Sequence, residues 1–443
     1  MMDQPSSRVT NFIFGLNYLV NHSDKLQCLK WAFLSRILCL IVSIAAINII
    51  PPHEADAFVL DKFLHNQTTI NKIVNHTLVG FARWDSLHFI QIAKRGYGHE
   101  SQIAFFPFYP GVVRAVKYTL FPWTTVSHDG LLIISGVLVN LILFMISSML
   151  IHHLTILIFR NRSMAMESVF HFCFNPASIF MTSCYSENLF QFFTLSGLTS
   201  IEFGRLSLAS VFFACASLTR SNGIISLGFV AYWHVSHICI LSGRVLRSAR
   251  LVEQFGIFLS HALMIVIPFI MFQSYSYYFI CFEPDLPDRK DFCASMISIP
   301  YTFVQKKYWS IGLFKYYRLK QIPNFLIASP MIYICSWIVC KYLQLNGKQF
   351  LDIIFNFRSR RRGPTLWNNG HVLPYIVHLA FLTFVSIFYM HVQVITRFVL
   401  SSTPIVYWAI SSSPNNKKYY FKLYFLSYFF LGTILHSTFY PWT

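Results

Sequence analysis

The chain has 443 residues, of which 55% are hydrophobic and 46 are phenylalanine, and its formal net charge is +18. This composition, with a mean hydropathy of +0.51, excludes the soluble globular and the disordered classes of protein. It predicts an all-α polytopic membrane protein. In such proteins Lys and Arg gather in short cytoplasmic loops, so the positive charge indicates topology and we expect no nucleic-acid partner.

Apolar stretches long enough to cross ~30 Å of hydrocarbon recur along the chain. The first, residues 31–50, follows Lys25 and Lys30 and is expected to be an uncleaved signal anchor. Together the stretches predict about eleven transmembrane helices in a single membrane domain of residues 1–443. The others lie at residues 131–157, 169–182, 189–201, 206–218, 224–241, 255–279, 325–339, 372–390, 398–410 and 421–434.

The distribution of basic residues predicts a cytoplasmic N-terminus. Two long loops then face the lumen: residues 51–130, in which helices are expected to lie on the membrane surface, and residues 281–324. The same orientation places the basic loops on the cytoplasmic side, at residues 160–162, 243–250, 358–363 and 417–418.

Four Asn-x-Ser/Thr sequons test this orientation. Asn66 and Asn75 are expected in the lumen, where they can be glycosylated, whereas Asn21 and Asn161 are expected to face the cytosol and to remain unmodified.

The ten cysteines show no metal-ligand spacing, and no Asp-x-Asp pair is present, so we expect no bound metal. Nucleotide-binding and zinc-protease motifs are also missing from the sequence. Cys281 and Cys293 bracket a polar stretch of the second long loop. An oxidising lumen permits a disulfide between them, and free thiols are the alternative.

Ionisable residues from five separate segments are expected at the lumenal surface. A charge at mid-membrane costs ~2.5–3.5 kcal/mol, so charged residues in a membrane protein usually serve a function or lie near an interface. Their convergence on one side indicates a functional site. Simpler explanations remain: an arginine can anchor a helix at the lipid headgroups, and an acidic residue can stabilise the start of a helix. The five residues are Asp85, Glu187, Arg220, Arg318 and Arg397.

Asp85 stands at the start of an amphipathic run in which Phe89 and Ile92 recur at helical spacing. We expect this run to lie flat on the membrane, which would hold the carboxylate at the water boundary. The alternative is a structural ion pair with Arg83 or Arg95. His88 either belongs to the same site or packs on the same helical face.

Five ordered blocks of the sequence are similar to signature segments of the PIG-V family of GPI mannosyltransferases. They are RWDSLHFIQIAKRGY with AFFPFYP after it, FNPASIFMTSCYSENLF, LTRSNGI, YWSIGLFKYYRLKQIPNFLIASP and HVQVITRFVLSSTPIVYW. The resemblance implies a GT-C-like fold in the endoplasmic reticulum membrane with a lumenal active site. It also implies transfer of the second mannose, in α-1,6 linkage, from dolichyl-phosphate mannose to the singly mannosylated GPI precursor. The donor is a lipid substrate, so no cofactor is expected.

An inverting displacement needs one base, and the resemblance assigns that role to Asp85. The departing phosphate needs cations, for which Arg220 and Arg397 are the first candidates and Arg318 the next. The other residues expected to contact the substrates are Arg83, Trp84, His88, Glu187, Asn222, Gln321 and His391. The sequence leaves open whether a small accessory membrane subunit is required.

Two other functions are compatible with the composition. One is a different polyprenyl-phosphate-dependent mannosyltransferase, which the five blocks disfavour. The other is a polytopic lipid transporter, whose polar groups usually gather at the membrane midplane rather than at one surface.

Overall fold

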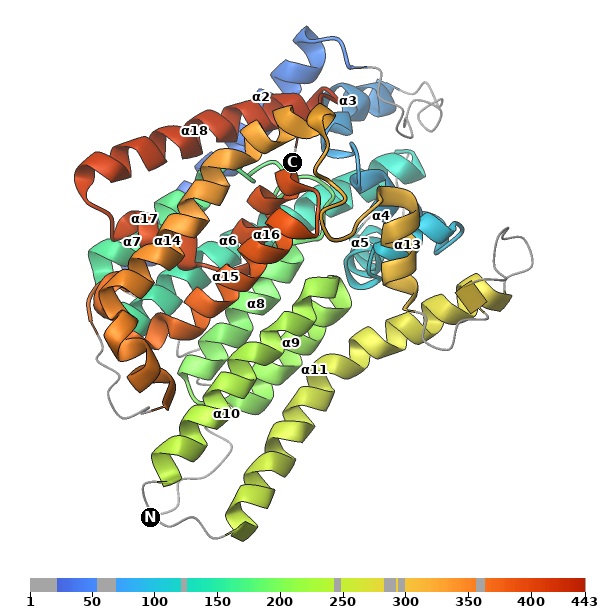
Figure 1. Cartoon of the computed structure of the whole chain (residues 1–443). Coiled ribbons are helices and arrows are strands. Elements are labelled where there is room, and N and C mark those ends of the chain that lie inside the picture. The colour runs from blue at the N-terminus through green and yellow to red at the C-terminus, as the bar shows by residue number, and fades with distance from the viewer. Residues whose placement is uncertain are drawn as a thin grey trace.

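The computed structural model describes residues 22–53, 69–120, 126–242, 248–282, 292–293, 299–355 and 363–442. Within these ranges the regular secondary structure is helical and includes no strand (Figure 1). The α-helices are α2 (His22–Ile49), α3 (Thr69–Leu78), α4 (Ser86–Arg95), α5 (Phe108–Leu120), α6 (His128–Phe159), α7 (Arg162–Cys173), α8 (Glu187–Glu202), α9 (Leu206–Thr219), α10 (Leu227–Ser242), α11 (Ser248–Phe282), α13 (Pro300–Trp309), α14 (Ile322–Phe355), α15 (Leu373–Phe388), α16 (Ile395–Ser402), α17 (Ile405–Ser411) and α18 (Asn415–Ser437).

The protein is a polytopic membrane protein with five or six candidate spans among the described helices. Five helices are long and apolar enough to cross a bilayer: His22–Ile49, His128–Phe159, Leu251–Phe282, Leu319–Gly347 and Gly370–Phe388. A sixth span results if Val392–Ser402 and Ile405–Ser411, which meet at 85°, form one broken crossing.

These spans are fewer than the eleven apolar stretches that the sequence suggested. Much of the difference arises in the middle of the chain, where α8 has 16 residues and α9 has 14. A rise of about 1.5 Å per residue makes such helices shorter than the hydrocarbon layer. Both pack closely on other helices of the bundle, α8 on α6 and α9 on α11. Their apolar composition therefore also reflects burial within the bundle.

The chain is non-helical over residues 174–186, between α7 and α8, although this segment is buried in the bundle. Arg36 of α2, only 1% exposed, satisfies much of its backbone. Its guanidinium donates to the carbonyl oxygen of Ser178 at 2.8 Å and to the hydroxyl of Thr182 at 2.9 Å. It also lies 3.9 Å from the centroid of the Phe144 ring. Irregular backbone at membrane depth is tolerated only where protein groups pair with it in this way.

Asparagine side chains complete the pairing of this non-helical segment. The amide of Asn140, from α6, donates to the carbonyl oxygens of Ser183 and Tyr185. Asn188 in turn donates to the carbonyl oxygens of Asn140 and Met181. The segment is thus held by side chains from both α6 and α8, and it leads directly to Glu187.

The amphipathic run that contains Asp85 forms α4, but its apolar face does not lie on lipid as expected. The buried side chains of α4 pack against α5 and α6, so this face belongs to the protein core. They include Leu87, Phe89, Ile90 and Ile92.

Cys281, at the end of α11, forms a disulfide with Cys293, twelve residues later. This pairing selects between the two alternatives that the sequence left open. Of the two expected glycosylation sites, Asn66 lies outside the described residues, and Asn75 is described only as part of the backbone of α3.

Candidate active site

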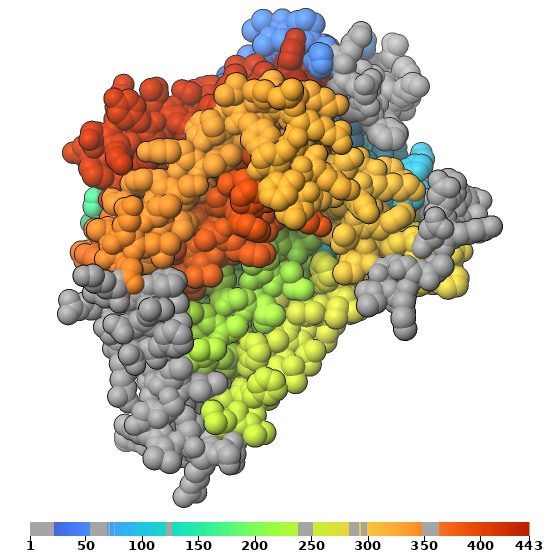
Figure 2. Space-filling view, in the orientation of Figure 1, coloured from blue at the N-terminus to red at the C-terminus, as the bar shows by residue number. Residues whose placement is uncertain are grey.

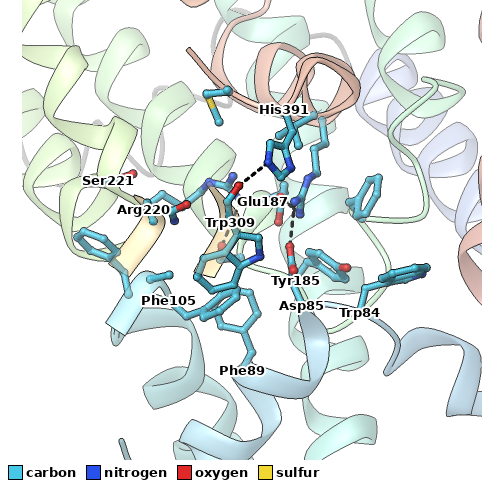
Figure 3. Close-up of a pocket in the computed structure, with 18 of the residues that line it drawn as sticks. Trp84, Asp85, Phe89, Phe105, Tyr185, Glu187, Arg220, Ser221, Trp309 and His391 are labelled. Atoms are coloured by element: carbon cyan, nitrogen blue, oxygen red, sulfur yellow. Dashed lines mark hydrogen bonds and ion pairs between the residues drawn. The ribbon is translucent and has the colours of Figure 1, made fainter. Parts of the chain in front are cut away.

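A pocket of about 350 Å³ lies at one end of the bundle, where some helices begin and others end (Figure 3). Helices α8 and α16 begin there, and α9, α15 and α18 end there. The charged groups of its lining are Asp85, Glu187, Arg220 and Arg397, with His391 beside them, and aromatic walls come from residues that include Trp84, Phe105, Tyr185, Tyr301 and Trp309.

Asp85 reaches this pocket through a tight turn in front of α4. Trp84 adopts a left-handed backbone conformation, with φ of 55°. A non-glycine residue pays roughly 1–2 kcal/mol for that conformation, and such strain persists where the surroundings hold it. The Trp84 ring packs on Phe439, with 5.5 Å between the ring centroids. Packing from the end of the chain therefore helps to hold the turn that presents Asp85.

Two guanidiniums and two carboxylates form one network in the pocket. Nη2 of Arg397 lies 2.8 Å from Oδ2 of Asp85, and Nη1 of the same side chain lies 3.4 Å from Oε1 of Glu187. Nη1 of Arg220 lies 2.6 Å from that same Glu187 oxygen. The formal charges of the four groups cancel, so an anionic ligand would find two cations that are already positioned by carboxylates.

The two carboxylates differ in access. The Glu187 side chain is fully buried, and as the first residue of α8 it lies at the positive end of the helix dipole. The Asp85 side chain is 29% exposed. A molecule that enters the pocket can therefore contact Asp85, whereas Glu187 serves to hold the arginines. Glu187 is thus both the first residue of α8 and part of the pocket lining.

Burial of Asp85 opposes its ionisation and raises its pKa. The charge and the hydrogen bond of Arg397 lower this pKa, and the charges of His88 and Arg220 lower it further by smaller amounts. The net result is that the pKa of the Asp85 carboxyl lies below its ordinary value. Asp85 is therefore ionised at neutral pH.

His391 stands opposite the arginines. Its Nε2 lies 2.7 Å from the carbonyl oxygen of Trp309, and its ring stacks on Tyr316 at 4.6 Å. Since a carbonyl can only accept, Nε2 carries a proton. Burial lowers the pKa of His391, which favours the neutral ring and leaves Nδ1 as an acceptor.

Several residues that the sequence suggested do not line this pocket. Asn222 donates to the hydroxyl of Ser402 at 3.0 Å, and Gln321 accepts from Asn324 at 2.7 Å. Arg318 lies on the surface, in the segment between α13 and α14. Their positions near motif residues in the sequence gave no information about which way the side chains point.

Arg83 and His88 are neighbours of the site without lining the pocket. Arg83 lines a separate small cavity beside Ser437, and its guanidinium lies 4.4 Å from the Phe439 ring centroid. His88 stacks on Phe105 with 4.5 Å between centroids, and Phe105 is part of the pocket wall. His88 therefore supports the wall, and burial lowers its pKa.

The sequence analysis missed several residues of the pocket lining, among them Tyr185, Tyr301 and Gln305. Tyr185 lies inside a block already noted for Glu187, so its position two residues before the carboxylate was an available signal. His436 and Trp442, near the end of the chain, also line the pocket and were not predicted.

The described part of the chain is thus a helical polytopic membrane protein whose pocket, with two carboxylates and two guanidiniums, is suited to an anionic substrate. Comparison with known proteins makes this specific, because the family described as "Mannosyltransferase (PIG-V)" matches residues 25–443. The chain belongs to the PIG-V mannosyltransferase family.

Relatives from distant animals align along nearly the whole chain. GPI alpha-1,6-mannosyltransferase 2 of Mus musculus is 30% identical over 493 residues, covering 96% of this chain and 100% of that protein. The protein of the same name from Homo sapiens is 30% identical, with coverage of 94% and 98%. GPI mannosyltransferase 2 of Drosophila melanogaster is also 30% identical, with coverage of 94% and 99%.

Proposed function

We propose that the chain is an α-1,6-mannosyltransferase of GPI-anchor biosynthesis. It moves the second mannose from dolichyl-phosphate mannose to the singly mannosylated GPI precursor in the lumen of the endoplasmic reticulum. The names of the relatives and the family support the activity. The observation that carries the assignment to this pocket is the accessible carboxylate of Asp85 held beside two guanidiniums.

Asp85 acts as the base. The acceptor hydroxyl oxygen attacks the anomeric carbon of the donor, and the bond from that carbon to the phosphate oxygen breaks with inversion. Asp85 takes the hydroxyl proton, and the electron pair leaves with the dolichyl phosphate. Arg220 and Arg397 stabilise the charge that develops on the phosphate. No second carboxylic acid is needed, because a phosphate departs as an anion, unlike the sugar alkoxide of a glycosidase.

The pairing of Asp85 with Arg397 suggests how donor binding activates the base. A carboxylate that shares a guanidinium is a weak base, because its pKa is low. A donor phosphate that accepts hydrogen bonds from Arg397 competes with Asp85 for the same nitrogen atoms. As Asp85 loses that partner its pKa rises, which strengthens the base when the donor is present.

The finer architecture is also a proposal. We assign a GT-C-like fold with about eleven transmembrane helices, in which helices too short to cross alone complete their crossings together with the segments that flank them. The N-terminus is cytoplasmic, and residues 51–130 and 281–324 belong to the lumenal side with the pocket. Mapping of glycans tests the orientation, since modification at Asn66 or Asn75 supports it and modification at Asn161 contradicts it.

The function is tested with the purified full-length chain in liposomes. Labelled dolichyl-phosphate mannose and the singly mannosylated GPI precursor are supplied, and the linkage of the product is analysed. An α-1,6-linked second mannose supports the proposal. Transfer to a different glycolipid, or none after membrane extract supplies any accessory subunit, contradicts it.

A further inference from the structure

The segment between α13 and α14, residues 310–321, is a basic and apolar surface next to the pocket. We call it the α13–α14 loop. Residues 299–324 contain no Asp or Glu. The cations of the loop, Lys315, Arg318 and Lys320, are exposed. Large apolar side chains are exposed between them: Leu313 by 57%, Phe314 by 56% and Leu319 by 86%. Figure 2 shows this part of the chain uncovered on the visible face.

The loop is a fixed platform. The backbone N–H of Phe314 donates to the carbonyl oxygen of Phe388 at 2.8 Å, and the hydroxyl of Tyr317 donates to that of Ile387 at 3.1 Å. Both acceptors lie at the end of α15. Trp309, at the end of α13, and Ile311, at the start of the loop, line the pocket. The distance between the pocket and the loop is therefore fixed for a ligand that contacts both.

The neighbours of the loop in the chain indicate that it lies at the level of the lipid headgroups. It connects to the start of α14 and covers the end of α15, both of which are candidate spans. Apolar side chains just beyond the loop are exposed, Leu326 of α14 by 66% and Phe384 of α15 by 57%. Exposed aromatic and basic residues at such a position are typical of a membrane–water interface.

We propose that the α13–α14 loop binds the phosphodiester of the acceptor lipid, an inference that rests on the proposed function. The arginines of the pocket are assigned to the donor phosphate, so a second phosphate requires cations outside the pocket. The acceptor carries its own phosphate between inositol and the lipid, separated from the reacting mannose by intervening sugar units. When that mannose lies in the pocket, the phosphate lies outside it at headgroup level, where the loop presents Lys315, Arg318 and Lys320.

The test compares the full-length chain with the variant Lys315→Gln/Arg318→Gln/Lys320→Gln in phosphatidylcholine nanodiscs. Equilibrium binding is measured for the singly mannosylated GPI precursor and for a synthetic form with the same glycan on a neutral, phosphate-free lipid. We expect the triple variant to bind the phosphate-containing acceptor at least about tenfold more weakly. Binding of the phosphate-free form should change less than about twofold.

The matched control is Arg95→Gln, which removes an exposed cation from α4. It should leave both affinities unchanged. Equal weakening for the two acceptors, no weakening, or a loss of donor affinity would each overturn the inference. So would a loss that appears only when phosphatidylserine is added to the discs, because the loop would then bind bulk anionic lipid. Mannose transfer by the wild-type chain, measured in the same discs, reports separately on the proposed function.

Discussion

The carboxylate of Asp85 lies 2.8 Å from the guanidinium of Arg397, although 312 positions separate the two residues in the chain. The pair joins the turn before α4 to the first turns of α16. Arg397 also reaches Glu187, so one side chain positions the accessible carboxylate and contacts the buried one. The orientation of Asp85 therefore depends on a helix near the end of the chain as well as on its neighbours in sequence.

Replacing Asp85 by Asn should lower the rate of mannose transfer by roughly 10² to 10⁴, because the amide cannot take the hydroxyl proton. The variant should still fold, since the side chain is partly exposed and carries little packing. Turnover is measured at matched amounts of protein, with Glu187→Gln beside it. Near-normal transfer by Asp85→Asn together with loss in Glu187→Gln would move the role of base to Glu187.

Arg397→Lys and Arg220→Lys should weaken use of the donor and leave some turnover. A lysine keeps a point charge but loses the two-pronged contact with phosphate, and a charge-assisted hydrogen bond is worth about 1.5–3 kcal/mol. The KM for dolichyl-phosphate mannose should therefore rise by roughly 10- to 100-fold. The KM for the acceptor serves as the control. A rise in that constant alone would place these arginines at the acceptor.

The pH profile should report the ion pair of Asp85. Its pKa is lowered from the ordinary value of 3.8, so the base stays ionised through mildly acidic pH and the acid limb that it causes lies below that value. Because its folded-state pKa is lowered, the ionised Asp85 also stabilises the fold. This stabilisation is fully present above the pKa of the unfolded state and is lost as the pH falls through the pKa of the folded state. In Arg397→Gln, burial still raises the pKa of Asp85, but the guanidinium that lowers this pKa is gone. The acid limb of the rate profile should therefore move to higher pH.

This shift is measured as kcat/KM from about pH 3 to about pH 8, which reports on the free enzyme. The comparison is repeated with His391→Asn in both backgrounds, since His391 also titrates in this pocket. An acid limb that stays in place when Arg397 is replaced would show that another group controls it.

Replacing Arg36 by Met should lower the free energy of unfolding by about 3 kcal/mol or more, because the Ser178 carbonyl and its neighbours lose their buried partner. The non-helical segment leads to Glu187, so transfer should fall as well. Thermal unfolding in detergent gives the measurement. Ile41→Ala is the control on the same helix, since that side chain is 58% exposed and should change little. Equal stability of the two variants would contradict the role of Arg36.

Replacing Cys281 by Ser should destabilise the region around α11 by up to about 3 kcal/mol, the chain-entropy value for a loop of this length. Peptide mapping without reductant checks the bond itself, and thermal unfolding checks its contribution. Alkylation of both thiols in the native protein, without prior reduction, would show that the bond is not formed.

The sequence predicts the depth of the charged residues in the membrane but not their positions around the bundle. Charge and hydropathy place Asp85, Glu187, Arg220 and Arg397 at one end of the bundle, and these four meet in the pocket. Arg318 has the same pattern in sequence, yet it lies on the surface. Hydropathy predicts how deep a residue lies in the membrane. Whether the residue faces the pocket or the outside depends on how the helices pack, and a single sequence does not specify that packing.

The spans show a similar limit. The long helices α2 and α6 follow directly from uninterrupted apolar runs. The run at residues 169–182 reads as one helix by composition, but α7 ends at Cys173, just ahead of Asn175 and Pro176. The residue before a proline avoids the helical conformation. Buried donors from other helices then make the non-helical path stable, and these contacts are long-range.

The wall formed by His436 and Trp442 has a consequence for biogenesis. A ribosome that has delivered every helix through α18 to the membrane has supplied His436 but not yet Trp442. A chain that stops just after α18 therefore has a pocket that lacks the Trp442 part of its wall. Synthesis of the segment after α18 is thus a step in the assembly of this pocket.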